Sequence, residues 1–345
     1  MKTIKLNNGV EMPQMGYGVY QVSPAECERC VADALSVGYR MIDTAQAYHN
    51  EEGVGNAVRR SGIDRGEIFL VSKVWISNYG YEKAKASIDE SLRKLQTDYI
   101  DLMLLHQPFC DRYGAYRALE EAYKEGKLRA IGVSNFYPDH FIDLASNMEI
   151  VPAVNQVETH VFDQQREPQR IMEEFGTRIM SWGPLAEGRN GFFTNPVLAE
   201  IGSKYGKSVA QVALRWLIQR GVIIIPKSTH VERMRQNLDI FDFTLTDEDM
   251  AAAANRIVEN RGGITVMENG QVLGEVTLSI AGIMSDDSLV MVNSALEDAK
   301  DEAFGLGVSR GIDPFMTLSF MALPVIPSLR ITTRGVFDVS SQRYI

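Results

Sequence analysis

The sequence predicts a (β/α)8 barrel of the TIM-barrel class, with a β-hairpin before it and a small α+β segment after it. Short apolar runs, which are typical of buried parallel strands, alternate with helical patterns and make about eight strand–helix units. Polar residues stand at or just after the ends of several of these runs. In such barrels the functional groups gather at the carboxyl ends of the strands, so these polar residues are candidates for one shared site.

The overall composition is that of a globular protein with an acidic balance. Its 345 residues suffice for one large barrel or for two domains, and 45% of them are hydrophobic and 23% charged. The net charge of -10 argues against a nucleic-acid partner. The chain has no apolar stretch of bilayer length and no apolar signal-peptide core near Met1, so we expect no membrane partner and a cytoplasmic location.

Two of the three cysteines form a CxxC pair, Cys27 and Cys30. Redox and zinc chemistry are the functional alternatives for such a pair. No second CxxC and no nearby His completes a metal site, and the pair lies inside a predicted helix. We therefore interpret the pair as structural, and free cysteines fit a reducing cytoplasm.

The first elements show clear start and stop patterns. Residues 3–13 predict a hairpin, because apolar and polar residues alternate on both sides of Asn8-Gly9. The first helix begins at Ser23-Pro24-Ala25-Glu26, which predicts an N-cap Ser, a Pro at the first helical position and the Glu of a capping box, and it ends at Gly38. The predicted barrel strands are 17–19, 39–43, 68–73, 100–105, 127–134, 153–157, 179–182 and 222–225.

The helices between these strands follow the 3.6-residue period. In the helix over 81–96, for example, Ala84, Ile88 and Leu92 fall on one face. Helices are also predicted around 51–60, 115–125, 138–147 and 165–175, and a second capping box, Ser208 to Gln211, opens another.

The alternation stops near residue 250. Thr246 caps a short Ala-rich helix over 250–257, and residues 262–273 predict a hairpin around Asn269-Gly270. A helix near 289–304 and a Pro-bounded segment over 314–327 follow. We predict two modules, with the barrel over residues 1–252 and the C-terminal segment over residues 253–345.

Four of the strand-end residues form a plausible proton-donating unit: Asp43, Tyr48, Lys73 and His106. A phenol is a weak acid at neutral pH, and a cationic Lys beside Tyr48 is expected to lower its pKa. Asp43 would keep Lys73 charged, and His106 would hydrogen-bond a substrate carbonyl or the phenol. Such a group of residues supplies a general acid at an oxygen that gains negative charge, as carbonyl reduction requires.

Carbonyl reduction also needs a hydride donor, and the sequence offers a nucleotide site other than GxGxxG. Gly16-Tyr17-Gly18 stops short of that motif, whereas Lys227-Ser228 follows the last strand, where barrels often bind phosphate. Lys227 and Arg233 together favour a 2′-phosphate, and hence NADPH over NADH. Trp182 is either a stacking partner for the nicotinamide or a core aromatic residue. Ser134, Asn135 and Gln156 end two other strands and are candidates to bind the carboxamide.

Seven stretches of the first 250 residues form a specific set: Met15-Gly16-Tyr17-Gly18-Val19-Tyr20-Gln21, Asp43-Thr44-Ala45-Gln46-Ala47-Tyr48, Asn50-Glu51-Glu52-Gly53-Val54-Gly55, Val71-Ser72-Lys73-Val74-Trp75, Leu104-Leu105-His106, Gly132-Val133-Ser134-Asn135-Phe136 and Ile225-Pro226-Lys227-Ser228. On these residues the chain resembles the aldo-keto reductase family, particularly its prokaryotic members. The resemblance implies an NADPH-dependent reductase of aldehydes or ketones, with Tyr48 as the acid and Asp43, Lys73 and His106 in support.

The resemblance also implies which residues bind cofactor and substrate. Trp75 and Phe109 would shape the substrate pocket. Two positions depart modestly from the family, because Trp182 replaces a Tyr and Gln236 replaces a Glu that often contacts the adenine. The residues implied for the cofactor are Gly18, Tyr20, Ser134, Asn135, Gln156, Trp182, Pro184, Leu185, Lys227, Ser228, Arg233, Gln236 and Asn237.

The end of the chain departs from that family altogether. Residues 255–259, 262–264, 280–286 and 313–327 resemble the C-terminal part of adenine deaminase, and they stand where the family's lid loop is usual. Deamination of that kind needs a metal-activated water. The five histidines form no HxH pair and none lies in the resembling fragment, so we do not expect deaminase activity. We therefore interpret the chain as a fusion protein.

Two functional alternatives remain open from the sequence. The first is an NADPH-dependent reductase of small-molecule carbonyls, for which keto-gluconates and methylglyoxal are both candidate substrates. The second is an NADPH-binding regulatory module with little turnover, because the lid loop is replaced. The apolar run over 315–326 must be buried, either as a substitute lid or in self-association through the C-terminal segment.

Overall fold

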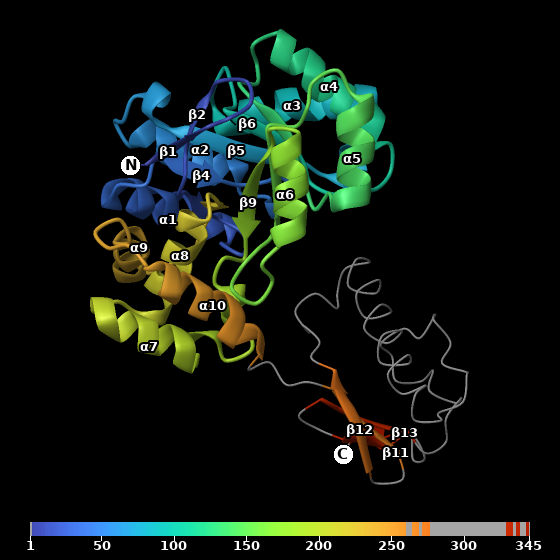
Figure 1. Cartoon of the computed structure of the whole chain (residues 1–345). Coiled ribbons are helices and arrows are strands. Elements are labelled where there is room, and N and C mark those ends of the chain that lie inside the picture. The colour runs from blue at the N-terminus through green and yellow to red at the C-terminus, as the bar shows by residue number, and fades with distance from the viewer. Residues whose placement is uncertain are drawn as a thin grey trace. The chain divides into compact units, whose positions relative to one another are not determined.

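The core of the protein is a parallel eight-stranded sheet surrounded by helices, as predicted (Figure 1). The computed structural model describes residues 2–259, 264–268, 271–276, 329–333, 336–338 and 343–344. In the barrel each strand pairs in parallel with the next along the chain, so the order in the sheet follows the sequence. The barrel strands are β3 (Tyr17–Gly18), β4 (Met41–Asp43), β5 (Phe69–Val74), β6 (Leu102–Leu105), β7 (Ile131–Ser134), β8 (Val154–Glu158), β9 (Arg178–Trp182) and β10 (Ile223–Ile224).

The first and last strands meet and close the sheet on itself. Met15 and Ile224 form a parallel bridge. The Gly16 amide donates to the Ile224 carbonyl at 2.8 Å, and the Ile224 amide donates to the Gln14 carbonyl at 3.0 Å. Gly18 packs directly against the last strand, because a Cβ at this position would lie 2.9 Å from the Ile225 carbonyl oxygen. Closure leaves no open sheet edge, and it brings the ends of the first and last strands together at one end of the barrel.

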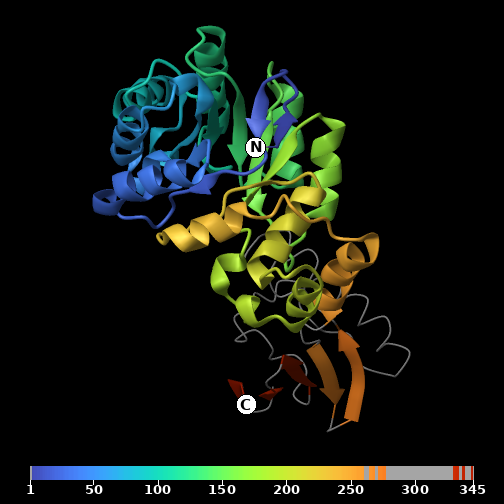
Figure 2. The same cartoon turned by 90° about the vertical axis from the view of Figure 1, so that its left-hand side faces the viewer.

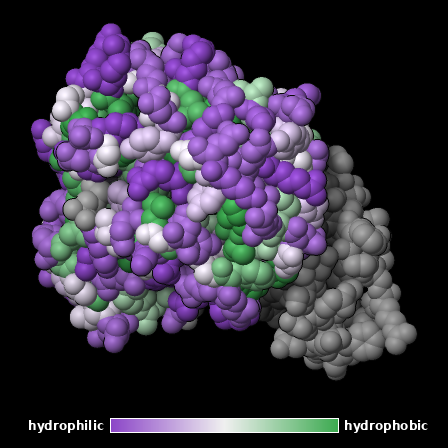
Figure 3. Space-filling model, turned by 90° about the horizontal axis from the view of Figure 1, so that it is seen from above, coloured by the Kyte–Doolittle hydropathy of each residue, from purple (hydrophilic) through white to green (hydrophobic). Residues whose placement is uncertain are grey.

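Helices cover the outside of the strands, and the turned view shows the same arrangement (Figure 2). Their outer faces carry charged side chains, and the surface seen from above is mostly hydrophilic with small hydrophobic groups (Figure 3). The helices of the first unit are α1 (Pro24–Val37), α2 (Glu51–Arg60), α3 (Tyr81–Leu95), α4 (Arg112–Lys124), α5 (Pro138–Asn147), α6 (Arg166–Glu174), α7 (Pro196–Tyr205), α8 (Val209–Gln219) and α9 (Val231–Leu238), and α10 (Asp247–Glu259) follows them.

Two helix starts differ from the sequence prediction. The capping box at Ser208 is confirmed, with both reciprocal hydrogen bonds present. The capping box at Ser23 is wrong: Ser23 is the N-cap, but its hydroxyl makes no backbone cap bond and instead donates to Glu26 at 3.3 Å. Helix α7 was not predicted, although Asn195 caps it by accepting from two backbone amides ahead of Pro196.

The N-terminal hairpin is confirmed as β1 (Thr3–Lys5) paired with β2 (Glu11–Pro13). Leu6 and Met12 belong to the same buried cluster as Met41, Phe69 and Leu102, which stand at the starts of barrel strands. The hairpin therefore packs at the amino end of the barrel and leaves the carboxyl ends of the strands for the site.

The chain divides into two compact units, residues 1–250 and residues 251–345. In the second unit, β11 (Ile264–Glu268) and β12 (Gln271–Val276) pair antiparallel, in the region of the predicted hairpin. Three further strands, β13 (Leu329–Thr333), β14 (Val336–Asp338) and β15 (Arg343–Tyr344), complete an antiparallel sheet of five. The predicted helix near 289–304 and the segment over 314–327 lie outside the described residues, and the boundary at residue 252 stays a prediction.

Candidate active site

The structure brings together the four residues of the predicted proton-donating unit. Asp43 ends β4, Lys73 lies in β5, and His106 follows β6 directly. Tyr48 is the last residue of η1, a short 3-10 turn over Gln46–Tyr48 between β4 and α2. The Tyr48 and His106 rings lie 5.6 Å apart between centroids. The polar residues at the ends of three neighbouring strands thus share one place with the tyrosine.

Lys73 is the centre of this group and has no exposed side-chain surface. Its ammonium group donates to Asp43 Oδ1 at 2.7 Å and to the Thr44 carbonyl at 2.8 Å. Its third contact is a longer one, to the Tyr48 hydroxyl at 3.5 Å. These partners match the three donors of an ammonium group. Burial lowers the pKa of Lys73, but Asp43 and Tyr48 outweigh burial and hold that pKa above its ordinary value, so Lys73 is a cation.

Tyr48 differs from the sequence prediction in the direction of its pKa shift. Burial raises the pKa of Tyr48, and this effect is larger than the lowering that Lys73 causes. The expected influence of Lys73 is therefore present but does not prevail. The Tyr48 hydroxyl is protonated at neutral pH, and this is the form that can donate a proton.

His106 is a neutral imidazole. Burial lowers its pKa to about 3, and the positive charge of Lys73 acts in the same direction. Its Nδ1 atom is buried and has no hydrogen-bond partner among the described residues. The ring also lies 5.0 Å from the ring of Trp75 between centroids. A neutral ring with one N–H can donate a hydrogen bond to an oxygen without bringing a second positive charge next to Lys73.

Three residues assigned to the carboxamide of the cofactor are linked to the site by hydrogen bonds. The Gln156 amide donates to Asp43 Oδ2 at 2.8 Å, and the Ser134 hydroxyl donates to the Gln156 carbonyl at 2.9 Å. Asn135 donates to the His106 carbonyl at 3.1 Å and accepts from the Trp182 indole at 2.8 Å. Trp182 is therefore held at the end of β9 by a polar partner that also holds the His106 loop.

The residues assigned to the phosphate end follow the last strand. Lys227 and Ser228 come directly after Ile225-Pro226, and Arg233, Gln236 and Asn237 lie on α9. The Ser228 hydroxyl accepts from the His230 amide at 3.1 Å, and Ser228 and Asn237 are buried. Lys227 and Arg233 are exposed and form no ion pair with any described carboxylate, whereas Arg235 on the same helix pairs with Glu232 at 2.6 Å. Pro184 and Leu185 lie in the loop after β9.

Aromatic side chains border the group formed by Asp43, Tyr48, Lys73 and His106. Tyr20, which the resemblance assigned to the cofactor, lies 5.1 Å from the Tyr48 ring between centroids and is 52% exposed. Phe109 is 55% exposed on the loop after β6. Trp75, directly after β5, is half-buried against His106. The wall around Tyr48 is thus aromatic and partly open.

The CxxC pair, Cys27 and Cys30, lies buried in α1 without a disulfide bond. Cys27 and Cys30 are buried and free, and burial raises the pKa of Cys27 to about 12 and that of Cys30 above its usual value. Protonated buried thiols are inert, so the structural interpretation stands. In the described part of the chain no cluster of three or more His, Cys, Asp or Glu could hold a metal ion. Among the same residues no helix has the length and apolar character needed to cross a membrane.

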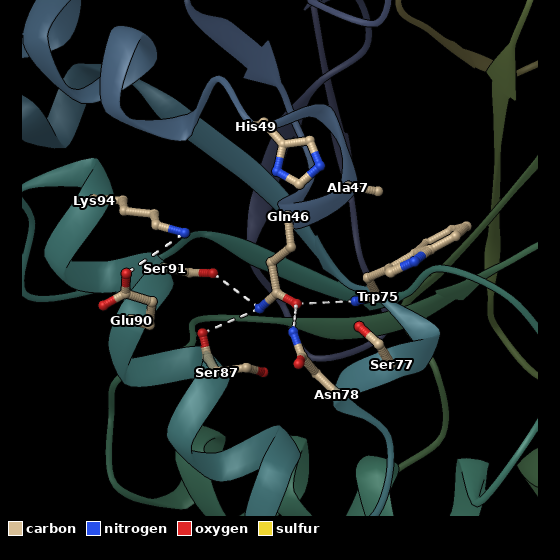
Figure 4. A pocket seen from close by; sticks show the side chains of 10 residues that line it. All are labelled: Gln46, Ala47, His49, Trp75, Ser77, Asn78, Ser87, Glu90, Ser91 and Lys94. Carbon is tan, nitrogen blue, oxygen red and sulfur yellow. Dashed lines mark hydrogen bonds and ion pairs between the residues drawn. The ribbon is translucent and has the colours of Figure 1, made fainter. Parts of the chain in front are cut away.

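Sequence reasoning missed two residues that contact the site. The Thr44 carbonyl accepts from Lys73, and no side-chain pattern reveals a backbone acceptor. The Gln46 amide makes hydrogen bonds to α3 and to the loop after β5, and it lines a pocket of about 460 Å³ (Figure 4). Gln46 stands inside the stretch from Asp43 to Tyr48, and its position two residues before Tyr48 was the only available indication.

Comparison with known proteins decides the family. The model of the aldo/keto reductase family matches residues 9–255. The chain belongs to the aldo/keto reductase family. A second model, of the adenine deaminase C-terminal domain, matches residues 238–343 and overlaps the first near α10. Both resemblances read from the sequence are therefore confirmed.

The similar proteins include a reductase and solved structures of aldo-keto reductases. Glyoxal reductase of Bacillus subtilis (strain 168) is 49% identical over 250 residues, which cover 72% of this chain and 90% of that protein. The crystal structure of an aldo/keto reductase from Brucella melitensis is 43% identical with a TM-score of 0.71, over 73% of this chain and 98% of that one. A Bombyx mori aldo-keto reductase in complex with NADP is 34% identical with a TM-score of 0.70, over 73% and 92%. This member of the family is thus an oxidoreductase of carbonyl compounds with a (β/α)8 fold.

Proposed function

We propose that this aldo/keto reductase uses NADPH to reduce small aldehydes or ketones to alcohols, with Tyr48 as the proton donor. The observation that carries the proposal is the position of Lys73, which is fully buried between the Asp43 carboxylate at 2.7 Å and the Tyr48 hydroxyl at 3.5 Å. A buried ammonium ion next to a protonated phenol is an arrangement for proton donation to an oxygen that gains charge. A structural ion pair alone would have no need of the phenol.

Each of the four residues has a distinct part in this proposal. Tyr48 gives its proton to the carbonyl oxygen as that oxygen becomes an alkoxide. Lys73 stabilises the phenolate that Tyr48 becomes, and Asp43 keeps Lys73 positively charged. Neutral His106 donates a hydrogen bond to the same carbonyl oxygen and orients it. NADPH, when bound, supplies the hydride.

The residues around the site fit this cofactor. Lys227 and Arg233 are exposed cations without ion-pair partners among the described carboxylates, as expected of side chains that bind an additional phosphate. Ser228 and Asn237 add polar groups beside them. At the other end, Asn135 fixes the Trp182 indole, and Ser134 and Gln156 lie close to the catalytic group. The same set would hold NADPH in preference to NADH, because only NADPH carries the 2′-phosphate.

Small reactive aldehydes are the first substrates to test. The wall formed by Tyr20, Trp75 and Phe109 is aromatic and partly exposed, and the relative at 49% identity is a glyoxal reductase. The two charged side chains next to Tyr48, Asp43 and Lys73, form an ion pair with each other at 2.7 Å. A neutral dicarbonyl such as methylglyoxal therefore suits it better than a charged keto-acid.

The variant Tyr48→Phe tests the role of the proton donor. It removes one hydroxyl and keeps the ring, so the rate of carbonyl reduction should fall by about 100- to 10,000-fold, which is the usual contribution of a general acid. NADPH affinity, measured by quenching of the protein fluorescence, should stay unchanged. Tyr123→Phe on α4 is the matched control, because it removes the same group outside the site and should leave the rate unchanged.

The two possible failures lead to different conclusions. Full reductase activity in Tyr48→Phe would remove Tyr48 from the mechanism. Tight NADPH binding by the unmodified chain, without turnover of any carbonyl compound, would instead favour the regulatory module.

A further inference from the structure

We propose that Gln46 is a positioning residue that holds the proton donor Tyr48 and the substrate-wall residue Trp75 in fixed positions relative to each other. This inference rests on the proposed function of Tyr48. Gln46 is the first residue of η1 and Tyr48 is the last, so any constraint on Gln46 acts on the turn that presents the proton donor. Nothing in the fold requires a primary amide at this position for packing, because its side chain reaches into a polar pocket (Figure 4).

The Gln46 amide makes hydrogen bonds to two separate elements. Its oxygen accepts from the Trp75 backbone amide at 3.0 Å and from the Asn78 side chain at 2.9 Å. Trp75 immediately precedes η3 (Ile76–Asn78), and Asn78 is the last residue of η3. Its nitrogen donates to the Ser87 carbonyl at 3.1 Å and to the Ser91 hydroxyl at 3.0 Å, both on α3. A primary amide has two donors and an oxygen that accepts twice, so these bonds use its whole capacity.

The partners of Gln46 are themselves fixed. Ser91 is fully buried, and it hydrogen-bonds the carboxylate of Glu51, which also accepts from Ser72 at 2.6 Å. Ser72 immediately precedes Lys73 in β5. Burial raises the pKa of Glu51, while the hydrogen bonds from Ser72 and Ser91 favour its ionised form. The hydrogen bonds of Gln46, which we call the tether, therefore connect to a buried polar network that reaches β5, the strand of Lys73.

The turn η1 needs this tether because its other contacts on the side facing the pocket are weak. The contact between Lys73 and the Tyr48 hydroxyl is long, at 3.5 Å. A pocket of about 460 Å³ lies beside Gln46, so side chains do not pack closely behind η1. On the other side of the turn, Thr44 donates to Asn50 at 2.7 Å and anchors the flanks. Hydrogen bonds of Gln46 thus replace packing on the open side.

The consequence concerns the geometry around His106. Tyr48 and Trp75 both lie against His106, with ring centroids 5.6 Å and 5.0 Å away. One amide group links the backbones that carry these two aromatic side chains. Loss of the amide would let the proton donor and the substrate wall shift independently, and a displacement of about 1 Å can cost ~100-fold in rate.

The test uses two variants of Gln46 and one matched control in the full-length protein. Gln46→Met keeps the length of the side chain and removes all four hydrogen bonds. Gln46→Glu keeps an oxygen for Trp75 and Asn78 but loses the donors to the Ser87 carbonyl and the Ser91 hydroxyl. Ser87→Ala lines the same pocket and keeps the backbone carbonyl that Gln46 uses, so it should match the unmodified protein.

Two readouts are compared across these proteins. The first is kcat and KM for methylglyoxal, measured with NADPH in excess. We expect Gln46→Met to lower kcat/KM by about 10- to 100-fold, through both constants, and Gln46→Glu to restore most of the loss. The second is hydrogen exchange of the Trp75 amide, which should speed up in Gln46→Met and stay slow in Gln46→Glu and Ser87→Ala.

Several results would overturn the positioning role. One is an unchanged kcat/KM in Gln46→Met, and another is a loss that Gln46→Glu does not restore. Unfolding of Gln46→Met would make Gln46 a general stability element instead. A lack of turnover in the unmodified protein would contradict the proposed function alone, since the exchange of the Trp75 amide still tests the tether without any activity.

Discussion

At the scale of single residues, the buried positive charge of Lys73 determines the chemistry that this site can support. Lys73 is fully buried and remains cationic because Asp43, Thr44 and Tyr48 accept its three hydrogen bonds. The sequence predicted Asp43 and Tyr48 as its neighbours, because these residues stand at or after the ends of successive strands. The sequence could not predict the contribution of Thr44, because its backbone carbonyl accepts the hydrogen bond from Lys73 and side-chain patterns do not reveal backbone acceptors. It also predicted the wrong net shift for Tyr48, because the extent of burial is a property of the folded chain.

His106 makes the stability of the fold depend on pH. Its pKa is about 3 when folded, against 6.5 for an ordinary His, so the unfolded chain takes up a proton in this range that the folded chain resists. Stability therefore falls as the pH drops below 6.5 and is unaffected by His106 above it. The expected slope is about 1.4 kcal/mol per pH unit, or about 2 kcal/mol between pH 6.5 and 5.

Urea unfolding of the protein and of His106→Gln at pH 7, 6 and 5 measures this contribution. The unmodified protein should lose about 2 kcal/mol more than the variant on going from pH 7 to pH 5. Parallel loss in both proteins would show that His106 titrates normally in the folded state. Carboxylates that titrate in the same range are common to both proteins and cancel in the comparison.

At the scale of elements, the strands were predicted more reliably than their limits. The apolar runs locate all eight barrel strands, because burial on both faces leaves a strong pattern. Strand limits differ by a few residues. The strand predicted over 100–105, for example, begins two residues later, at Leu102, because Ile100 forms only an isolated bridge to Leu128. Helix α7 was missed because it adds to the regular repeat, and Ser23 was misjudged because its hydroxyl prefers the Glu26 carboxylate.

Asp101 links strand β5 to strand β6 at the amino end of the barrel. Its fully buried carboxylate accepts from Arg65 at 2.8 Å, from Arg129 at 2.6 Å and from the Leu70 amide at 2.9 Å. Asp101→Asn removes the charge and leaves two arginines without their partner. We expect the free energy of unfolding to fall by about 1 to 3 kcal/mol, because charge-assisted hydrogen bonds are lost but the two arginines are partly exposed and stay hydrated. Chemical denaturation of the purified variant measures it.

The kinetic constants of Asp101→Asn should stay unchanged, because the site lies at the other end of the strands. Lys124→Ala is the control, since the pair of Lys124 with Glu149 is exposed and its loss should have little effect on stability. Equal denaturation midpoints for Asp101→Asn and the unmodified protein would show that Asp101 does not hold β5 and β6 together.

At the scale of the whole molecule, the chain joins two segments that are related to different protein families. The first unit carries the reductase barrel, and the second region matches the adenine deaminase C-terminal domain. The sequence predicted this change of family, because residues 280–286 and 313–327 resemble the C-terminal part of adenine deaminase. The substrate was not predictable, since the residues that the resemblance assigns to the pocket, Trp75 and Phe109, lie in loops, which strand and helix patterns do not describe. We propose that the full chain carries the reductase activity of its barrel.

One measurement tests this account most directly. The oxidation of NADPH by the full-length protein is followed by the absorbance of the reduced nicotinamide, with methylglyoxal, other aldehydes, ketones and keto-sugars, and NADH is tested in parallel. We predict turnover of small aldehydes with a clear preference for NADPH, as Tyr48, Lys73 and the Lys227 and Arg233 cations require. Binding of NADPH without oxidation of it by any of these compounds would contradict the account.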